Sequence, residues 1–195
     1  MNTTKTYLWD FKEFLPPTVF SPDEEIAHIF LNRYLNVCLK PLQEFSGIGF
    51  HRYQLGDKLP SSQALCQFMI QKFQPEFLET GENKCVILND EPLYVVQMKQ
   101  NCYTGANYTD ILKLVRKVIP FDKIPIIDRL WIDQVHQQWL QKHGPTPYLR
   151  IDYITTLETS ERLLIEIEAV NAILFSKAAT PALERKVQQI LKAFV

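Results

Sequence analysis

Hydrophobic residues recur along the chain in two periods, which predict a mixture of helices and strands. Helical spacing, with apolar residues three and four positions apart, predicts helices over residues 22–35 and 125–143, a short helix near 109–118, and a last one from Thr180-Pro181 to the end. Ser21 is the expected N-cap of the first helix, with Pro22 at its first position and Glu24 completing a capping box. Gly144 provides a stop for the long helix.

Apolar runs between these helices predict strands. Asn89-Asp90, a dipeptide typical of tight turns, joins two of the runs into a β-hairpin, and residues 75–83 are predicted to be a loop. Because helices and hairpins alternate irregularly, the order favours an α+β fold over a doubly wound parallel sheet. The predicted strands cover residues 37–40, 51–53, 68–73, 85–88, 91–99, 148–154 and 163–171.

The last two predicted strands carry acidic residues among their apolar positions, namely Asp152 on the first and Glu166 and Glu168 on the second. A buried carboxylate without a counter-charge costs several kcal/mol, so these positions favour a bound cation. Glu166 and Glu168 are two residues apart and share a strand face, and an antiparallel neighbour could bring Asp152 onto the same face. Oxygen ligands of this kind suit Mg²⁺. The alternative interpretation is a solvated sheet face.

Composition narrows the classes of partner. The 195 residues are 46% hydrophobic, with 21 basic and 22 acidic side chains and no dense basic run, which argues against nucleic-acid and anionic-membrane partners. No apolar run approaches the roughly 20 residues of a membrane span, and the polar start is not a signal peptide, so we expect a cytoplasmic protein. The four cysteines and four histidines show no zinc-ligand or disulfide spacing.

Five segments in order resemble the ATP-grasp ligases, specifically the glutathione-synthetase-like and cycloserine-type branch. Residues 37–42 with 46–49 are similar to that family's strand and glycine-rich loop, "vvlKPl…gG.G". Residues 147–152 with 165–175 are similar to its "YaRvDlv…lElEliePslF" block. The other matching segments are the hinge strand at 70–77, Gly81-Glu82, and the hairpin through 89–92 with 96–99.

The resemblance implies a fold, a cofactor set and site residues. The fold is two α+β lobes with mainly antiparallel sheets, here about 1–72 and 73–195, that clamp ATP with Mg²⁺. The implied function is an ATP- and Mg²⁺-dependent carboxylate–amine or carboxylate–thiol ligase acting through an acyl phosphate, with a small-molecule or peptide carboxylate as substrate. The implied site residues are Lys40, Gly47 and Gly49 at the phosphates, Gln71, Lys72 and Phe73 near adenine, Lys99 at the phosphate or acyl site, and Asp152, Glu166, Glu168 and Asn171 at the metal.

Several departures from the family pattern keep other hypotheses open. Three family arginines are replaced by Lys84, Gln97 and Gly105, and only a guanidinium gives the bidentate contact. The usual amino-terminal domain of roughly a hundred residues does not precede the matching region, so a homo-oligomer or a partner chain is a candidate source of it. The alternatives are a fragment of a longer protein, a non-catalytic or partner-dependent nucleotide-binding module descended from such a ligase, and a plain α+β interaction domain.

Overall fold

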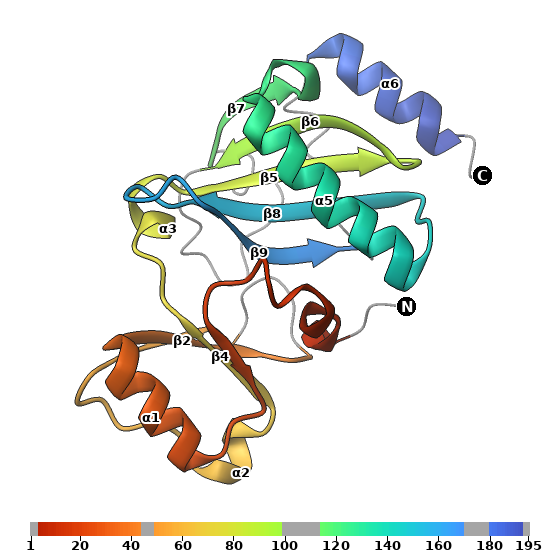
Figure 1. The fold of residues 1–195 in the computed structure, drawn as a ribbon. Helices are drawn as coiled ribbons and strands as arrows, with labels where there is room; N and C mark the ends of the chain where they lie inside the picture. The colour runs from red at the N-terminus through yellow and green to blue at the C-terminus, as the bar shows by residue number, and fades with distance from the viewer. Residues whose placement is uncertain (1–3, 44–48, 99–113, 170–179, 193–195) are drawn as a thin grey trace. The chain divides into compact units, whose positions relative to one another are not determined.

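The computed structural model describes residues 4–43, 49–98, 114–169 and 180–192. The chain divides into two compact units, and among the described residues one extends to Pro75 and the other begins at Glu76. Each unit is built on one antiparallel sheet (Figure 1). The predicted α+β class is therefore confirmed.

The first unit is a four-stranded sheet in the order β1-β4-β2-β3, with helices packed against it. Its core joins apolar residues of α1, such as Phe30 and Leu31, to Val37, Leu39 and Ile70 of the sheet. The elements are the 3-10 helix η1 (Lys5–Phe11), β1 (Thr18–Phe20), α1 (Glu24–Tyr34), β2 (Asn36–Pro41), β3 (His51–Gln54), α2 (Ser62–Leu65) and β4 (Phe68–Lys72).

The start of α1 differs from the sequence prediction. Asp23, and not Ser21, is the N-cap, because its side chain accepts a hydrogen bond from the backbone N–H of Ile26 at 2.7 Å. Ser21 has a φ of 46° and its N–H donates to the carbonyl of Phe68, so Ser21 is held at the first residue of β4 instead. Asp, like Ser, is a strong cap residue, and Asp23 stands two positions after Ser21.

The second unit is a five-stranded sheet in the order β7-β6-β5-β8-β9. The predicted hairpin is confirmed, since β5 and β6 pair around Asn89 and Asp90, whose positive φ values of 50° and 59° are those of a type I′ turn. The elements are α3 (Glu76–Glu79), β5 (Glu82–Leu88), β6 (Glu91–Met98), β7 (Val115–Pro120), η2 (Phe121–Lys123), α5 (Ile126–His143), β8 (Tyr148–Thr155), β9 (Arg162–Glu168) and α6 (Pro181–Lys192).

Different helices cover the two faces of this sheet (Figure 1). α5 lies across one face, where the ring of Trp131 is 5.2 Å from that of Tyr153. α6 packs on the other face through Val187, which joins a cluster with Val86 and Val96. Because side chains alternate along a strand, residues an even number of positions from Val86 share the α6 face.

Two sequence predictions in this unit are wrong in part. The helix near 109–118 falls partly outside the described residues, and its described end belongs to β7, which pairs with β6. The loop at 75–83 holds the short helix α3 and the first residues of β5. Polar residues at the start of β5, including Lys84, hid the strand because they belong to the site described below.

Within the described parts of the chain, no helix is both long and apolar enough to span a membrane.

Candidate functional site

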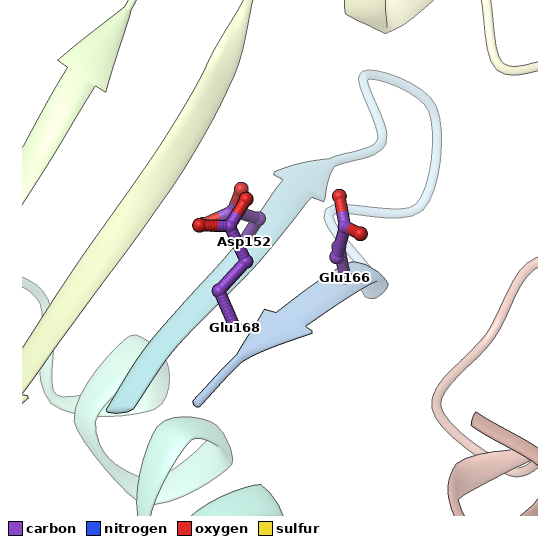
Figure 2. Close-up of side chains that lie close together, drawn as sticks. All are labelled: Asp152, Glu166 and Glu168. Carbon is purple, nitrogen blue, oxygen red and sulfur yellow. The ribbon is translucent and has the colours of Figure 1, made fainter. Parts of the chain in front are cut away.

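The acidic strands β8 and β9 place three carboxylates next to one another (Figure 2). Asp152 is paired directly with Glu166, and Glu168 follows two residues later on β9. One oxygen from each of the three carboxylates lies within 4.8 Å of the others. The structure thus brings together three of the four predicted metal ligands, and the fourth, Asn171, lies outside the described residues.

A β-bulge at Ile165 produces this arrangement. Leu164 pairs with Tyr153, but the next pair is Asp152 with Glu166, so Ile165 is an extra residue on β9. The extra residue shifts the alternation by one and places Glu166 on the face of Asp152. The sequence signal is the unbroken apolar run 163–165, which cannot alternate between a core face and a polar face in a regular strand.

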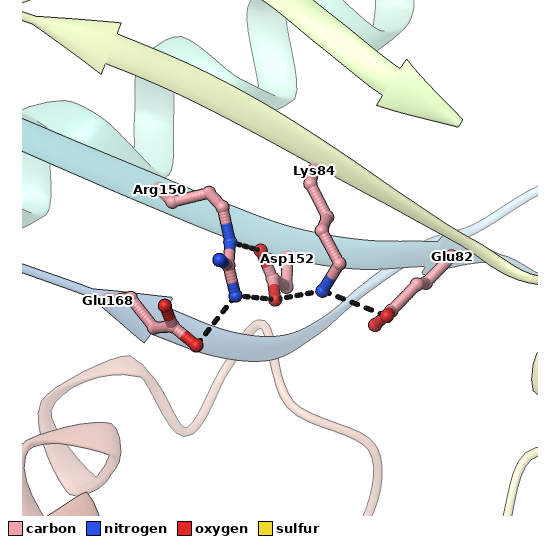
Figure 3. A network of polar contacts seen from close by, with 5 residues as sticks. All are labelled: Glu82, Lys84, Arg150, Asp152 and Glu168. Carbon is pink, nitrogen blue, oxygen red and sulfur yellow. Dashed lines mark hydrogen bonds and ion pairs between the residues drawn. The ribbon is translucent and has the colours of Figure 1, made fainter. Parts of the chain in front are cut away.

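Asp152 is the centre of a charged network that also contains Glu82, Lys84, Arg150 and Glu168 (Figure 3). Its carboxylate accepts hydrogen bonds from Arg150 Nε at 2.7 Å, Arg150 Nη2 at 2.8 Å and Lys84 Nζ at 2.5 Å. Lys84 also contacts Glu82 at 2.8 Å, and Arg150 contacts Glu168 at 2.6 Å. All five residues stand on the α6 face of strands β5, β8 and β9.

The network corrects the argument made from the sequence. Asp152 is 2% exposed, so a solvated sheet face is wrong for this residue, whereas Glu166 and Glu168 are only partly buried. The cations that neutralise Asp152 come from the protein itself, and its burial does not require a metal. The case for a metal therefore depends on the total charge of the network together with Glu166, and not on Asp152 alone.

Electrostatic interactions inside the network keep its central groups ionised. Burial alone would raise the pKa of the Asp152 carboxyl, but the charges of Arg150 and Lys84 outweigh it and lower that pKa. Burial would likewise lower the pKa values of Lys84 and Arg150, and the neighbouring carboxylates raise both instead. Asp152, Lys84 and Arg150 are thus charged at neutral pH.

Glu168 behaves differently. Burial and the nearby charges of Asp152 and Glu166 raise the pKa of its carboxyl to about 7, against the opposing effect of Arg150, whose guanidinium is shared with Asp152. When every group is ionised, the network and Glu166 together hold four carboxylates and two cations. The excess of two negative charges and the grouping of carboxylate oxygens fit a divalent cation such as Mg²⁺.

The first unit holds a second polar cluster around Lys40. The Lys40 ammonium donates to Gln71 Oε1 at 2.7 Å, and Gln71 Nε2 donates to Thr18 Oγ1 at 2.8 Å. The Thr18 hydroxyl donates in turn to the carbonyl of Pro16 at 2.7 Å. We call Thr18, Gln71 and Lys40 the Lys40 relay.

The predicted adenine segment lies at the end of β4. The backbone N–H of Lys72 donates to Pro17 O at 2.9 Å and that of Phe73 donates to Asn36 O at 3.0 Å. The Phe73 side chain is buried, with the Arg52 guanidinium 4.2 Å from its ring centroid. Phe73 is thus a packing residue, and the two amide hydrogens are already used within this unit.

Gly49 has a structural reason to be glycine. Its φ is +72°, and a Cβ at this position would lie 2.8 Å from Cγ of Pro41, the residue after Lys40. Substitution would strain the backbone and push against the end of β2. The other two predicted residues of the phosphate and acyl sites, Gly47 and Lys99, lie outside the described residues.

Sequence reasoning gave no role at the acidic site to Glu82 or Arg150 and treated Lys84 only as a departure from the family pattern. The available signal was their spacing, because each of these three residues stands two positions from another charged residue, beside an apolar run. Charged residues at alternate positions on three strands indicate one polar face, once the strand order is known.

Comparison with known proteins supports the family assignment. A curated glutathione synthetase from Synechocystis sp. is 27% identical over 123 residues, which cover 60% of this chain and 37% of that protein. The chain therefore spans little more than a third of the length of this relative. The fold of this chain is similar to that of D-cycloserine synthetase DcsG. The TM-score is 0.74 at 14% identity, and the match covers 100% of this chain and 71% of DcsG.

A second solved structure with a similar fold is the ATP-grasp ligase PsnB complexed with minimal precursor, Mg and ADP. The TM-score is 0.63 at 15% identity, covering 97% of this chain and 59% of that chain. The family described as prokaryotic glutathione synthetase, ATP-grasp domain, matches residues 4–108, more than half of the sequence. The chain thus belongs to the glutathione synthetase ATP-grasp family.

Proposed function

We propose that this chain is the nucleotide- and metal-binding part of an ATP- and Mg²⁺-dependent ligase that joins a carboxylate to an amine or a thiol. The observation that carries the proposal is the meeting of Asp152, Glu166 and Glu168 on one sheet face, beside Lys84 and Arg150. Family membership and the PsnB complex with Mg and ADP support the choice of cofactors.

The carboxylates have a defined task in this proposal. Asp152, Glu166 and Glu168, with Asn171 as a further candidate, hold Mg²⁺, which supplies electrostatic stabilisation of the phosphoryl group that is transferred. Arg150 orients Asp152 and Glu168 by contacting both of them. This preorganisation keeps the ligands in position before the nucleotide arrives.

The nucleotide is assigned to the other predicted residues. Lys40, Gly47 and Gly49 lie at the phosphates, and Lys99 at the phosphate or acyl site. Residues 71–73 meet adenine through carbonyl oxygens, because the N–H groups of Lys72 and Phe73 are already donated. Carbonyl oxygens suit the exocyclic amine of adenine, which is a hydrogen-bond donor.

The reaction proceeds in two transfers. An oxygen of the substrate carboxylate attacks the γ-phosphorus, the bond to the β-phosphate oxygen breaks, and ADP leaves from the acyl phosphate. The amine or thiol then attacks the acyl carbon, loses its proton, and displaces inorganic phosphate. The substrate is a small molecule or a peptide.

One observation favours the alternative of a non-catalytic or partner-dependent nucleotide-binding module. Lys84 stands at the position of a family arginine, yet its ammonium contacts both Glu82 and Asp152. Its charge is thus used within the protein and is less available to a phosphate or a substrate carboxylate. In this alternative the chain binds nucleotide but releases no ADP.

Titration calorimetry of ATP with and without Mg²⁺ tests both functions. We expect Mg²⁺-dependent binding by the wild-type chain, lost in Glu166→Gln with Glu168→Gln and kept in Glu158→Gln, an exposed control on the turn between β8 and β9. Absence of binding by the folded wild type would refute both the ligase and the non-catalytic module for this chain by itself, and only a partner-dependent module would remain. If binding is found, ADP release in the presence of carboxylate and amine mixtures separates the ligase from the non-catalytic module.

A further inference from the structure

The Lys40 relay has a fixed direction of hydrogen bonding. Lysine can only donate, so the Gln71 atom that faces it must be the amide oxygen. The Thr18 hydroxyl gives its single proton to Pro16 O and must therefore accept from the Gln71 amide nitrogen. Every group in the row has one possible role, and the orientation of the Gln71 amide follows from its two neighbours.

The sheet supports this row of side chains. Thr18 and Cys38 are the cross-strand partners of Gln71 on either side, and Lys40 is two residues beyond Cys38 on the same strand. Thr18, Gln71 and Lys40 therefore share one sheet face, with Gln71 on the central strand β4. Gln71 is 2% exposed, and such a buried amide is costly to leave without its partners.

The amide fixes the direction of the lysine and brings no charge of its own. A free lysine side chain has about 2 kcal/mol of rotamer entropy that is lost when it binds a phosphate. A carboxylate at position 71 would hold Lys40 equally well, but it would cancel the positive charge that a phosphate requires. The neutral oxygen of Gln71 restricts the ammonium in advance, which lowers the entropic cost of binding.

We propose that Thr18 and Gln71 are positioning residues that aim the Lys40 ammonium at the phosphates of the bound nucleotide. The proposal rests on the proposed function, because it requires that nucleotide binds beside Lys40. Thr18, on the edge strand, touches no nucleotide and acts only through the orientation of the Gln71 amide. Removal of its hydroxyl lets that amide turn over and withdraw the acceptor from Lys40.

The test compares Thr18→Val with Thr18→Ser, since valine keeps the shape of threonine and serine keeps its hydroxyl. We expect ATP affinity to fall about tenfold in Thr18→Val and Gln71→Leu, as for loss of a hydrogen bond to a charged group, and to stay near wild type in Thr18→Ser. We expect Lys40→Met to show the largest loss of ATP affinity. Circular dichroism and thermal unfolding check that each variant is folded.

The affinity for adenosine, which has no phosphates, distinguishes a positioning role of Thr18 from a merely structural one. If Thr18 and Gln71 act through Lys40, Thr18→Val weakens ATP and ADP but leaves the affinity for adenosine unchanged, as followed by protein-observed NMR. Equal weakening of adenosine and ATP would mean that the substitution disturbs β4 itself, and the proposal would be wrong. Equal ATP affinity of Thr18→Val and wild type would also overturn it.

The outcomes separate this proposal from the proposed function. If the folded wild-type chain binds no ATP, the proposed function fails and the positioning role is rejected with it. If wild type binds ATP and only Lys40→Met is defective, the proposed function stands and the positioning role fails. Without nucleotide, reductive methylation of Lys40 should be faster in Thr18→Val than in Thr18→Ser, and equal rates would contradict the relay.

Discussion

The charged network of the second unit and the Lys40 relay of the first unit are each built from three neighbouring strands, but they compensate charge differently. In the network, Lys84 and Arg150 each contact two carboxylates, so charge is balanced by opposite charge. In the relay, Lys40 donates to the neutral amide of Gln71, which in turn donates to the Thr18 hydroxyl. The network can hold a cation because it keeps a surplus of carboxylates, whereas the relay directs a cation through a neutral acceptor.

This difference shows that ionisable residues on a sheet face can have different roles, either to bind a cation or to orient one. A buried ion pair is costly to break because the remaining charge has no partner. A hydrogen bond from a charged group to a neutral acceptor is cheaper to lose and adds mainly direction. Substitutions in the network should therefore affect folding most, and substitutions in the relay should affect ligand affinity most.

The largest expected effect is the loss of stability in Asp152→Asn, because this substitution leaves Lys84 and Arg150 buried beside a neutral amide. We expect the free energy of unfolding to fall by about 3–5 kcal/mol, as for other broken buried ion pairs. Urea unfolding followed by tryptophan fluorescence measures it. Asp133→Asn, the same change at an exposed position of α5, should stay within about 0.5 kcal/mol of wild type. A loss below about 1 kcal/mol in Asp152→Asn would show that the charge of Asp152 contributes little to the stability of the network.

Gly49→Ala probes the strand end beside the relay. A left-handed backbone costs an ordinary residue about 1–2 kcal/mol, and the new Cβ would also meet Pro41 Cγ at 2.8 Å. Gly56→Ala is the matched control, because Gly56 also has a positive φ but its Cβ would meet nothing within 4 Å. Thermal unfolding should show a greater loss of stability for Gly49→Ala than for Gly56→Ala. Equal losses would mean that the contact with Pro41 relaxes freely.

The pH dependence of unfolding separates the two kinds of carboxylate in the network. Asp152 has a lowered pKa, so its contribution to stability is present above its unfolded pKa and is lost as pH falls through the folded one. The pKa of Glu168 is raised from 4.5 to about 7, so the folded state binds the proton more tightly and its contribution falls as pH rises across that window.

Unfolding in metal-free buffer between pH 4 and 8, roughly the window in which Glu168 titrates, measures this contribution. Glu168→Gln should be less sensitive to rising pH than wild type, and Glu158→Gln should keep the wild-type slope. An unchanged slope in Glu168→Gln would assign the titration to another group.

The smallest effect concerns two buried thiols that report on the two clusters separately. Cys38 lies on β2 with its Sγ 3.6 Å from Gln71 O, and Cys85 lies on β5 beside Lys84. Burial raises the pKa of both thiols, so both should resist alkylation, whereas Cys66 is exposed. Mass spectrometry in a Cys102→Ser background measures each rate. Asp152→Asn should speed labelling of Cys85 more than that of Cys38, and equal acceleration would mean that the units open together.

Much of the fold could be predicted because its signals are local. The α5 periodicity, the Asn89-Asp90 turn and the apolar strands each lie in a short segment, and the ordered family motifs supplied the arrangement. The cap of α1 and the first strand residues of β5 were predicted wrongly or missed. In both places polar residues were assigned by local propensity, although Ser21 and Lys84 are held by partners far away in the sequence.

The candidate site was predictable only as a set of acids. The sequence indicated that Asp152, Glu166 and Glu168 belong together, and their common face is observed. It did not indicate that Arg150 and Lys84 neutralise Asp152, because that depends on strand order and register. The metal, phosphate and adenine assignments remain predictions, and those of Gly47, Lys99 and Asn171 lie outside the described residues.

The bulge at Ile165 makes the acidic site depend on strand register as well as on composition. If Ile165 paired with Asp152 in a regular ladder, Glu166 and Glu168 would turn toward the face covered by α5, while every ligand residue remained in the sequence. A relative that lost Ile165 would instead have no bulge and would still place Glu166 opposite Asp152. The spacing that must be inherited is therefore the one between the two glutamates, whereas the apolar run before Glu166 can lose its one unpaired residue without moving them.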